Sequence, residues 1–356
     1  MKPGARAQAA IDILDDIQKR HRPANQALAD WGRAHRFAGS GDRAAIGNIV
    51  FDALRKRATI GHVMGEEAPR ALALGALAHI WGETPDAIEA MCEDSQYGPA
   101  PVTDEEKARF DSSLPEDAPS WVKGDYPEWL DGSFARAFAK ARIEQGAAMA
   151  QRAPVDLRVN TLKADREKVL KSLHKFKPEP TRFSPVGLRI APPQGPGRNP
   201  HLEADAGHGK GWFEIQDEGS QIAALLAGAV SGMQVADLCA GSGGKTLALA
   251  AAMANKGQLY AWDADAIRLR PIFERLKRAG IRNIQVLKGG DSEALAGLAG
   301  KMDVVVIDAP CSGSGVWRRR PDAKWRLRPA ALERRKQEQV QVLEQGECLV
   351  KPGGRL

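Results

Sequence analysis

A thiol and a carboxylate lie close together in the run Asp308-Ala309-Pro310-Cys311. The thiolate of cysteine is a strong nucleophile, and a neighbouring carboxylate can hold a substrate or take part in proton transfer. A lone cysteine is more often a small buried apolar residue. Here, however, it follows a strand-like run and is continued by CSGSGVWRRRPDAKW, in which flexible glycines precede several cations. This context indicates covalent chemistry more than simple packing.

The cations that follow Cys311 are interleaved with Trp317 and Trp325. Such a pattern can track a phosphate backbone and stack unpaired bases. The alternative is a solvated, charged start of a helix. We predict RNA contacts by five residues of this segment: Arg318, Arg319, Arg320, Lys324 and Arg326.

A glycine-rich turn in MQVADLCAGSGGKT, residues 233–246, joins a strand-like run to an alanine-rich helix. A Walker loop requires glycine where Cys239 stands, and a dinucleotide fingerprint counted from Gly241 meets Thr246 instead of glycine. An acidic strand end, Asp237, followed by Gly-x-Gly is typical of the first loop of S-adenosylmethionine-dependent methyltransferases. A plain structural turn is the competing interpretation. The predicted cofactor residues of this loop are Cys239, Ala240, Gly241, Ser242, Gly243, Gly244 and Lys245.

Three further strands are predicted downstream at 258–262, 284–287 and 304–307, and helices alternate with them. This alternation predicts a parallel sheet with helices on both faces, in which ligands gather at the carboxyl ends of the strands. Asp237, Asp263, Asp291 and Asp308 all lie at such ends. A single aspartate in this position is more often a helix cap or turn former.

The aspartates after these strands have separate expected roles. Asp263 is placed to accept hydrogen bonds from a ribose diol, and Asp291 lies where an adenine edge is recognised. Asp308 completes the predicted cofactor set. Lys245 could hold Asp308 or a substrate base, so Cys311, Asp308 and Lys245 are the predicted catalytic residues.

The remaining chain is predicted to be helical at first and mixed later. Apolar residues recur at helical spacing over 9–17 and 43–63, with one more helix over 82–98. A helix over 129–150, a strand over 155–159 and a helix over 166–174 then form a small α+β unit. The expected domains are 1–143, 144–215 and 216–356.

Composition narrows the class of protein further. The 356 residues carry a net charge of +6 and a pI near 9.1, which suits an anionic partner. The four cysteines show no CxxC pair or metal-ligand spacing, so no metal site is expected and a reducing cytoplasm is the natural setting. The most apolar run, residues 71–81, is too short to span a bilayer, so no membrane contact is expected.

Together the motifs resemble the Sun/Nop-type RNA cytosine-5 methyltransferase family, in particular its bacterial ribosomal-RNA branch (RsmB, or Fmu/Sun). The matching stretches are LRVNTLKADREKVL, FEIQDEGSQIAALL, DLCAGSGGKT, AWDAD, GGDS and DAPCSGSGVWRRRPDAKW. GDRAAIGNIVFDALRKR also resembles the NusB-type helical RNA-binding domain. One departure is Gly241-Ser242, where the family more often has Ala-Pro.

The resemblance implies a Rossmann-like class I methyltransferase domain, preceded by the small α+β unit and an all-α NusB-like domain. It implies S-adenosylmethionine as cofactor and ribosomal RNA, 16S in this branch, as partner; a monomer is expected. In the family, a thiolate adds to C6 of cytosine, C5 then attacks the methyl sulfonium, and loss of the C5 proton expels the thiol. Asp308 would hydrogen-bond the cytosine and Lys245 would assist.

The family nucleophile lies in a Thr-Cys motif after the fifth strand, and the Pro-Cys cysteine, here Cys311, assists product release. VKPGGRL is expected to open that fifth strand, so the nucleophile is expected beyond Leu356. The chain is then a fragment of a longer protein whose sheet it truncates, or another segment covers the open edge of the sheet. Three alternatives remain. Cys311 itself could be the nucleophile, as in DNA cytosine methyltransferases; the chain could be an RNA-binding scaffold with a vestigial cofactor pocket; a nucleotide hydrolase is disfavoured by Cys239.

Overall fold

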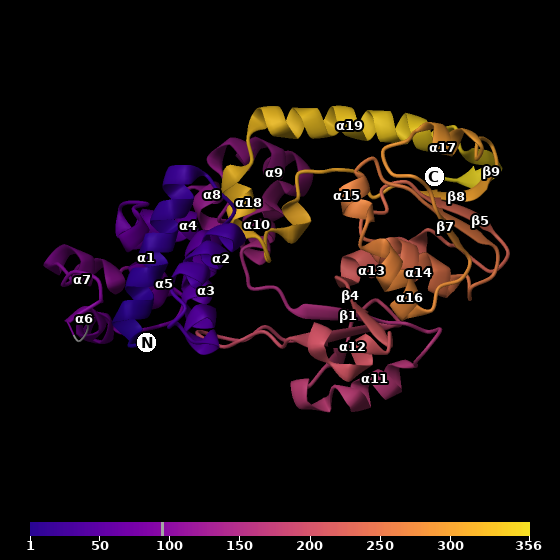
Figure 1. The fold of residues 1–356 in the computed structure, drawn as a ribbon. Helices are drawn as coiled ribbons and strands as arrows, with labels where there is room; N and C mark the ends of the chain where they lie inside the picture. Colours follow the sequence, from indigo (N-terminus) through magenta and orange to yellow (C-terminus); the bar gives the residue numbers. More distant parts are fainter. Residues whose placement is uncertain (94–95) are drawn as a thin grey trace. The chain divides into compact units, whose positions relative to one another are not determined.

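The computed structural model describes residues 1–93 and 96–356, which form two compact units (Figure 1). The helical unit comprises Met1–Ala153, Pro192–Asn199 and Gly313–Arg328. The sheet unit comprises Pro154–Ala191, Pro200–Ser312 and Pro329–Leu356. Neither unit is one continuous stretch of chain. This division into two units does not test the expected domain boundaries at 143/144 and 215/216, which remain predictions.

The helical unit is a bundle around α1, α3 and α5, whose apolar faces share one core containing Leu14, Ile46 and Leu72. Among the described residues no helix is both long and apolar enough to cross a bilayer. The elements of the helical unit are α1 Pro3–Arg20, α2 Ala24–Ala34, α3 Ser40–Arg55, α4 Arg57–Met64, α5 Pro69–His79, α6 Pro85–Glu93, α7 Asp104–Phe110, α8 Ser120–Lys123, η1 Glu128–Leu130, α9 Asp131–Phe138, η2 Ala139–Ala141, α10 Arg142–Met149, η5 Ser314–Val316 and α18 Pro321–Arg326.

Two of the long predicted helices of this unit are interrupted. The helix expected over 43–63 ends at Arg55 and restarts at Arg57. The prediction of one continuous helix over 129–150 is wrong, because α9 ends before Ala139, which has φ 47° and ψ −121°. The prediction over 9–17 lies within α1, and that over 82–98 is represented by α6. Residues 94 and 95 of that prediction lie outside the described residues.

The first part of the sheet unit is a small antiparallel sheet in the order β2-β3-β1-β4. The strand predicted over 155–159 is confirmed as β1, with Leu157 opposite Leu188 of β3 and Ile215 of β4. Buried Leu157, Val169 and Phe213 form the core. The elements are β1 Val155–Val159, α11 Arg166–Ser172, η3 His174–Phe176, β2 Glu179–Pro180, β3 Gly187–Ile190, η4 Leu202–Ala204, α12 Ala206–Gly209 and β4 Phe213–Ile215.

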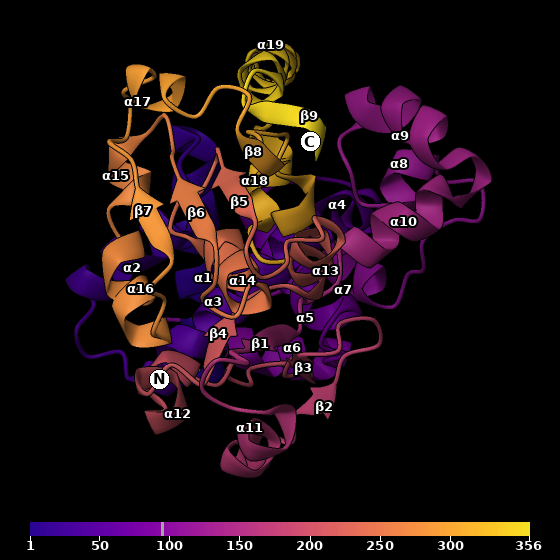
Figure 2. The same cartoon turned by 90° about the vertical axis from the view of Figure 1, so that its right-hand side faces the viewer.

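The second part is a parallel five-stranded sheet in the order β7-β6-β5-β8-β9 (Figure 2). One face carries Val235, which packs with Leu249 of α14; the other carries Ala236, which packs with Leu295 of α17. The elements are α13 Glu218–Leu226, β5 Gln234–Asp237, α14 Gly244–Ala252, β6 Gln258–Ala261, α15 Ala266–Leu269, α16 Ile272–Ala279, β7 Ile284–Val286, α17 Glu293–Ala296, β8 Met302–Val306, α19 Pro329–Glu347 and β9 Val350–Arg355. The predicted doubly wound α/β class is confirmed.

Details of this sheet refine two predictions. The single helix expected over 267–279 is two helices, α15 and α16, because Pro271 between them has no amide hydrogen to donate. The opening of a fifth strand at VKPGGRL is confirmed as β9, which pairs with β8 in an irregular register. From β5 the chain first adds β6 and β7 on one side of the sheet and then crosses to the other side, where β8 pairs with β5. The topological switch point therefore lies between β5 and β8.

Candidate active site

The turn after β5 needs glycine for steric reasons. Gly241 and Gly243 have φ values of 50° and 88°, in the left-handed region that glycine adopts readily. A Cβ on Gly243 would also lie 2.6 Å from Ile272 Cγ1. The Gly241 amide donates to Asp263 Oδ2 at 2.8 Å, and the Ala240 amide donates to the Trp262 carbonyl at 3.0 Å. The turn is therefore fixed against the end of β6.

Asp237 ends β5 beneath this turn and is almost fully buried. Its Oδ2 accepts a 2.7 Å hydrogen bond from Thr246 Oγ1 in the first turn of α14, whereas Oδ1 has no hydrogen-bond partner among the described residues. Burial raises the pKa of Asp237 to about 6. A buried carboxylate oxygen without a donor suits a ligand that brings a cationic or N–H group.

The acids after β6 and β7 adjoin the same turn. Asp263 is buried, and its second oxygen, Oδ1, accepts from the Asp265 amide at 2.8 Å. The Asp263 carbonyl accepts from the Gly290 amide at 3.0 Å, and the Asp291 carbonyl accepts from Trp262 Nε1 at 3.0 Å. The structure thus brings Asp263 and Asp291 together along one rim with the Gly241 turn. Their recognition of ribose and adenine stays a prediction.

Lys245 and Asp308 meet at the switch point. Lys245 Nζ lies 2.6 Å from Asp308 Oδ2; the lysine side chain is 13% exposed and the aspartate 58%. Lys245 begins α14 beside the glycine turn, and Asp308 follows β8. The lysine is therefore fixed by its surroundings, while more than half of the aspartate faces open space where a substrate group could reach it.

The two cysteines of the region differ in environment. Cys239, in the turn, is half-buried, and burial raises the pKa of its thiol to about 12, so it stays protonated at neutral pH. Cys311 is exposed, and the carbonyl of the preceding Pro310 accepts a 2.8 Å hydrogen bond from Gln339 Nε2 of α19. Cys311 is therefore the thiol of this pair that a large substrate could reach.

The predicted RNA-binding segment folds into the helical unit from Gly313 onward. Lys324 is 1% exposed, and its ammonium donates to the carbonyls of Arg55 and Asp125. Burial lowers the pKa of Lys324 to about 7. The structure therefore differs from the expectation of a phosphate-binding lysine, because the expectation treated every cation of the segment as solvated.

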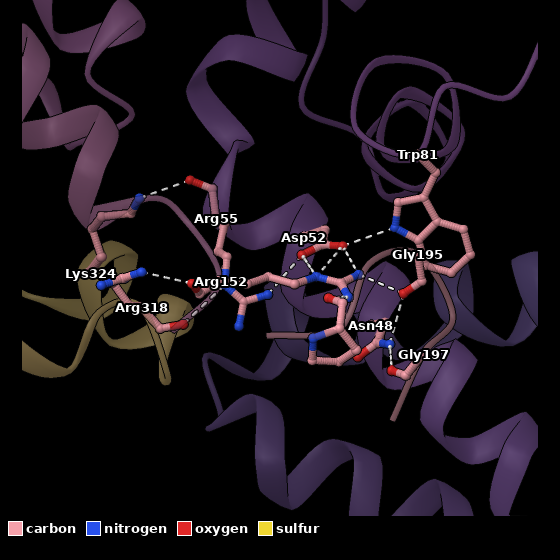
Figure 3. Close-up of polar contacts among 10 residues, drawn as sticks. Asn48, Asp52, Arg55, Trp81, Arg152, Gly195, Gly197, Arg318 and Lys324 are labelled. Carbon is pink, nitrogen blue, oxygen red and sulfur yellow. Dashed lines mark hydrogen bonds and ion pairs between the residues drawn. The ribbon is translucent and has the colours of Figure 1, made fainter. Parts of the chain in front are cut away.

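Arg318 also takes part in the interior of the helical unit (Figure 3). It donates from Nη2 to the Arg152 carbonyl at 2.8 Å, and its own carbonyl accepts from Arg55 Nε at 3.0 Å. Buried Asp52 accepts hydrogen bonds from Arg55, Arg152 and Trp81 Nε1. Arg319, Arg320 and Arg326 remain exposed. Three of the five predicted residues are thus available at the surface of this unit.

One residue beside the glycine turn was not indicated by any motif. Arg275 of α16 donates from Nη1 to both the carbonyl and the hydroxyl oxygen of Ser242 at 2.9 Å. The contact depends on how α16 packs against the turn, so no spacing in the sequence could reveal it.

The strand order, the glycine turn after the central strand and the acids along its rim define a methyltransferase-type doubly wound domain. The family model of 16S rRNA methyltransferase RsmB/F matches residues 224–356, and that of the RsmF/B-like ferredoxin-like domain matches residues 126–195. The chain belongs to the RsmB/F family of 16S rRNA methyltransferases. The resemblance inferred from the motifs is thereby confirmed.

Two curated relatives show the extent of the likeness. "Probable ribosomal RNA small subunit methyltransferase B" of Synechocystis sp. is 32% identical over 237 residues, which are 65% of this chain and 52% of that protein. "Ribosomal RNA small subunit methyltransferase B" of Enterobacter sp. is also 32% identical, over 65% of this chain and 53% of that protein. The chain spans about half the length of the curated relatives it matches.

Solved structures share the fold. The crystal structure of PH0851 has a TM-score of 0.72 and 23% identity, covering 99% of this chain and 85% of that one. The crystal structure of NSun6 from Pyrococcus horikoshii with SFG has a TM-score of 0.57 and 22% identity, covering 64% of this chain and 81% of that one. At these identities the likeness concerns the fold alone.

Proposed function

We propose that the protein transfers a methyl group from S-adenosylmethionine to C5 of a cytosine in ribosomal RNA, the 16S RNA in particular. The observation that carries this proposal is the Lys245–Asp308 pair at the switch point, between the glycine turn and exposed Cys311. The names of the curated relatives support ribosomal RNA as the substrate class. A cytoplasmic location, where ribosomes assemble, follows from that substrate, and we propose a monomer without metal.

The rim residues suit S-adenosylmethionine, which carries an ammonium group, a carboxylate, a ribose diol and an adenine. The unpaired oxygen of Asp237 could accept from the ammonium group. The turn of residues 239–245 offers backbone amides at the start of α14, which favours the carboxylate. Asp263 is proposed for the ribose and Asp291 for the adenine. When bound, the cofactor supplies an electrophilic methyl group.

The chain's own residues have separate proposed tasks at the base. Asp308, held by Lys245, accepts a hydrogen bond from the exocyclic amine of cytosine and thereby orients the ring. Cys311 assists product release after methyl transfer. At that stage a base takes the C5 proton, the C5–C6 double bond re-forms, and the thiolate that had added to C6 leaves. Arg319, Arg320 and Arg326 contact RNA phosphates, whereas buried Lys324 and partly buried Arg318 are left out of the proposed contact set.

The first test of this proposal uses the whole protein. S-adenosylhomocysteine is titrated calorimetrically, and tritiated methyl transfer to 16S RNA is measured in wild type and in Asp308→Asn. We expect wild type to bind S-adenosylhomocysteine, and we expect methyl transfer to fall about 100-fold in Asp308→Asn, as for other groups that stabilise a transition state. Wild type that binds S-adenosylhomocysteine but methylates no ribosomal RNA would support another substrate; no binding at all would support the scaffold interpretation.

The role of Cys311 is tested separately in Cys311→Ala. If Cys311 assists release, a covalent protein–RNA adduct accumulates and survives denaturing electrophoresis. If Cys311 is itself the nucleophile, both the adduct and the activity disappear. Cys311→Ser serves as the control for side-chain size.

A further inference from the structure

Ser242 in the glycine turn is held by a side chain from a distant helix. Ser242 lies between Gly241 and Gly243, both in the left-handed region. Arg275 Nη1 reaches it from α16 and donates to the Ser242 carbonyl and to Oγ, each at 2.9 Å. A turn with glycines on either side of Ser242 loses much conformational entropy when it becomes ordered, so this anchor opposes its mobility.

The other edge of the Arg275 guanidinium is held by Glu214 of β4. Arg275 donates to Glu214 Oε2 from Nη2 at 2.8 Å and from Nε at 3.2 Å. Glu214 is 3% exposed. Burial alone would raise its pKa, but Arg275 and Arg278 outweigh that effect and hold the pKa of Glu214 below its usual value. The carboxylate is therefore a charged and fixed support at neutral pH.

A planar guanidinium suits this arrangement because its donors point in fixed directions and can serve two partners at once. One edge binds the small antiparallel sheet through Glu214, and the remaining nitrogen binds the turn. Arg278, one helical turn later, donates to the same carboxylate at 2.7 and 2.9 Å, and within the described part of the chain its side chain makes no hydrogen bond to the turn. The two arginines thus share a partner and differ in what they reach.

We propose that Arg275 is a positioning residue that holds the glycine turn in its ligand-binding conformation, with Glu214 of the small sheet as its support. The small sheet thereby contributes to cofactor affinity without touching the cofactor. This inference rests on the proposed function, because it takes the turn to be the cofactor loop.

The test compares Arg275→Ala with Arg278→Ala in the full chain by calorimetric titration of S-adenosylhomocysteine, together with thermal unfolding. Loss of two neutral-acceptor hydrogen bonds predicts roughly 5- to 30-fold weaker binding for Arg275→Ala. The affinity of Arg278→Ala for S-adenosylhomocysteine is expected to lie within about 2-fold of that of wild type, because the substitution removes one donor to Glu214 but leaves the turn anchored. Arg275→Lys, which retains the charge but not the two-sided geometry, should also weaken binding.

A double-mutant cycle with Ser242→Ala tests whether the effect passes through the turn. Arg275→Ala should cost less in the Ser242→Ala background than in wild type, because one of its two turn contacts is already absent. A purely structural role is recognised by equal losses of melting temperature and affinity in Arg275→Ala and Arg278→Ala, and that result overturns the inference. If wild type binds no S-adenosylhomocysteine, the proposed function fails instead.

Discussion

At the scale of single residues, two aspartates at the rim of the sheet occupy opposite environments. Asp237 is buried, its Oδ1 has no hydrogen-bond partner within the described residues, and burial raises its pKa to about 6. Asp308 is 58% exposed and paired with Lys245. Acids whose surroundings differ in this way take different roles: the buried one suits a ligand group that compensates its charge, and the exposed one suits a substrate.

The raised pKa of Asp237 predicts a pH-dependent stability. Between about pH 4 and pH 6 the unfolded chain loses this proton while the folded chain keeps it, so the contribution of Asp237 to the free energy of unfolding falls as pH rises. A shift of about two units corresponds to a loss of about 3 kcal/mol, complete above the folded pKa. Asp237→Asn cannot ionise and escapes this loss.

The measurement is the melting temperature of Asp237→Asn minus that of wild type, without ligand, at several pH values. The difference should grow between about pH 4 and pH 7, since all other carboxyl groups are common to both proteins. Thr246→Val, which removes the hydrogen bond that Thr246 Oγ1 donates to Asp237 Oδ2, is the control for the local contact. A difference independent of pH contradicts the prediction.

At the scale of elements, the short helix α18 caps the end of α3. The last carbonyls of an α-helix have no partner within the helix. Here the Arg55 carbonyl accepts from Lys324 Nζ, and the Leu54 carbonyl accepts from Trp325 Nε1 at 2.6 Å. The segment that resembled an RNA-binding stretch therefore serves first to complete a helix terminus of the bundle.

Lys324→Met should destabilise the helical unit. The substitution keeps most of the apolar volume but removes the donor of two buried carbonyls, which predicts a loss of about 2–4 kcal/mol. We expect a lower melting temperature and faster amide exchange at the end of α3. Arg320→Met, which replaces an exposed cation at the N-cap of α18, should change stability by less than about 0.5 kcal/mol. Equal effects of the two variants would falsify the capping role.

At the scale of the whole molecule, the two units are interleaved along the chain. Gly313–Arg328 leaves the sheet unit between β8 and α19 and completes the helical unit, and Pro192–Asn199 does so after β3. Trp317 is buried there and stacks on Phe134 with ring centroids 6.3 Å apart. The core of the helical unit is therefore incomplete in residues 1–153 alone.

A fragment of residues 1–153 is expected to unfold less cooperatively than the same region of the whole protein and to bind a hydrophobic dye, because the surface that covers Trp317 is uncovered. A peptide of residues 313–328 added in trans should raise its melting temperature. The same peptide with Trp317→Ala and Lys324→Met should not. A fragment that is fully cooperative and indifferent to the peptide contradicts this picture.

Local pattern was sufficient for much of the fold. β1 lies where alternating residues predicted it. Of the parallel strands, β5 ends at Asp237, and β6, β7 and β8 end shortly before Asp263, Asp291 and Asp308, because strand periodicity and turn residues are local features of the sequence. Breaks such as Ala139 had no sequence signal, since nothing in an alanine indicates a positive φ. Pro271 did carry a signal, and the helix expected across it should have been divided there.

The sequence by itself determined the family, the α/β class and the set of rim residues, because all of these follow from residue types at short spacings. Only the tertiary structure decided which cations are buried, as with Lys324, and which distant side chains meet, as with Arg275 and Ser242. The physical reason is that burial and long-range hydrogen bonds depend on how elements far apart in the chain pack, and spacing along the chain carries no record of that packing.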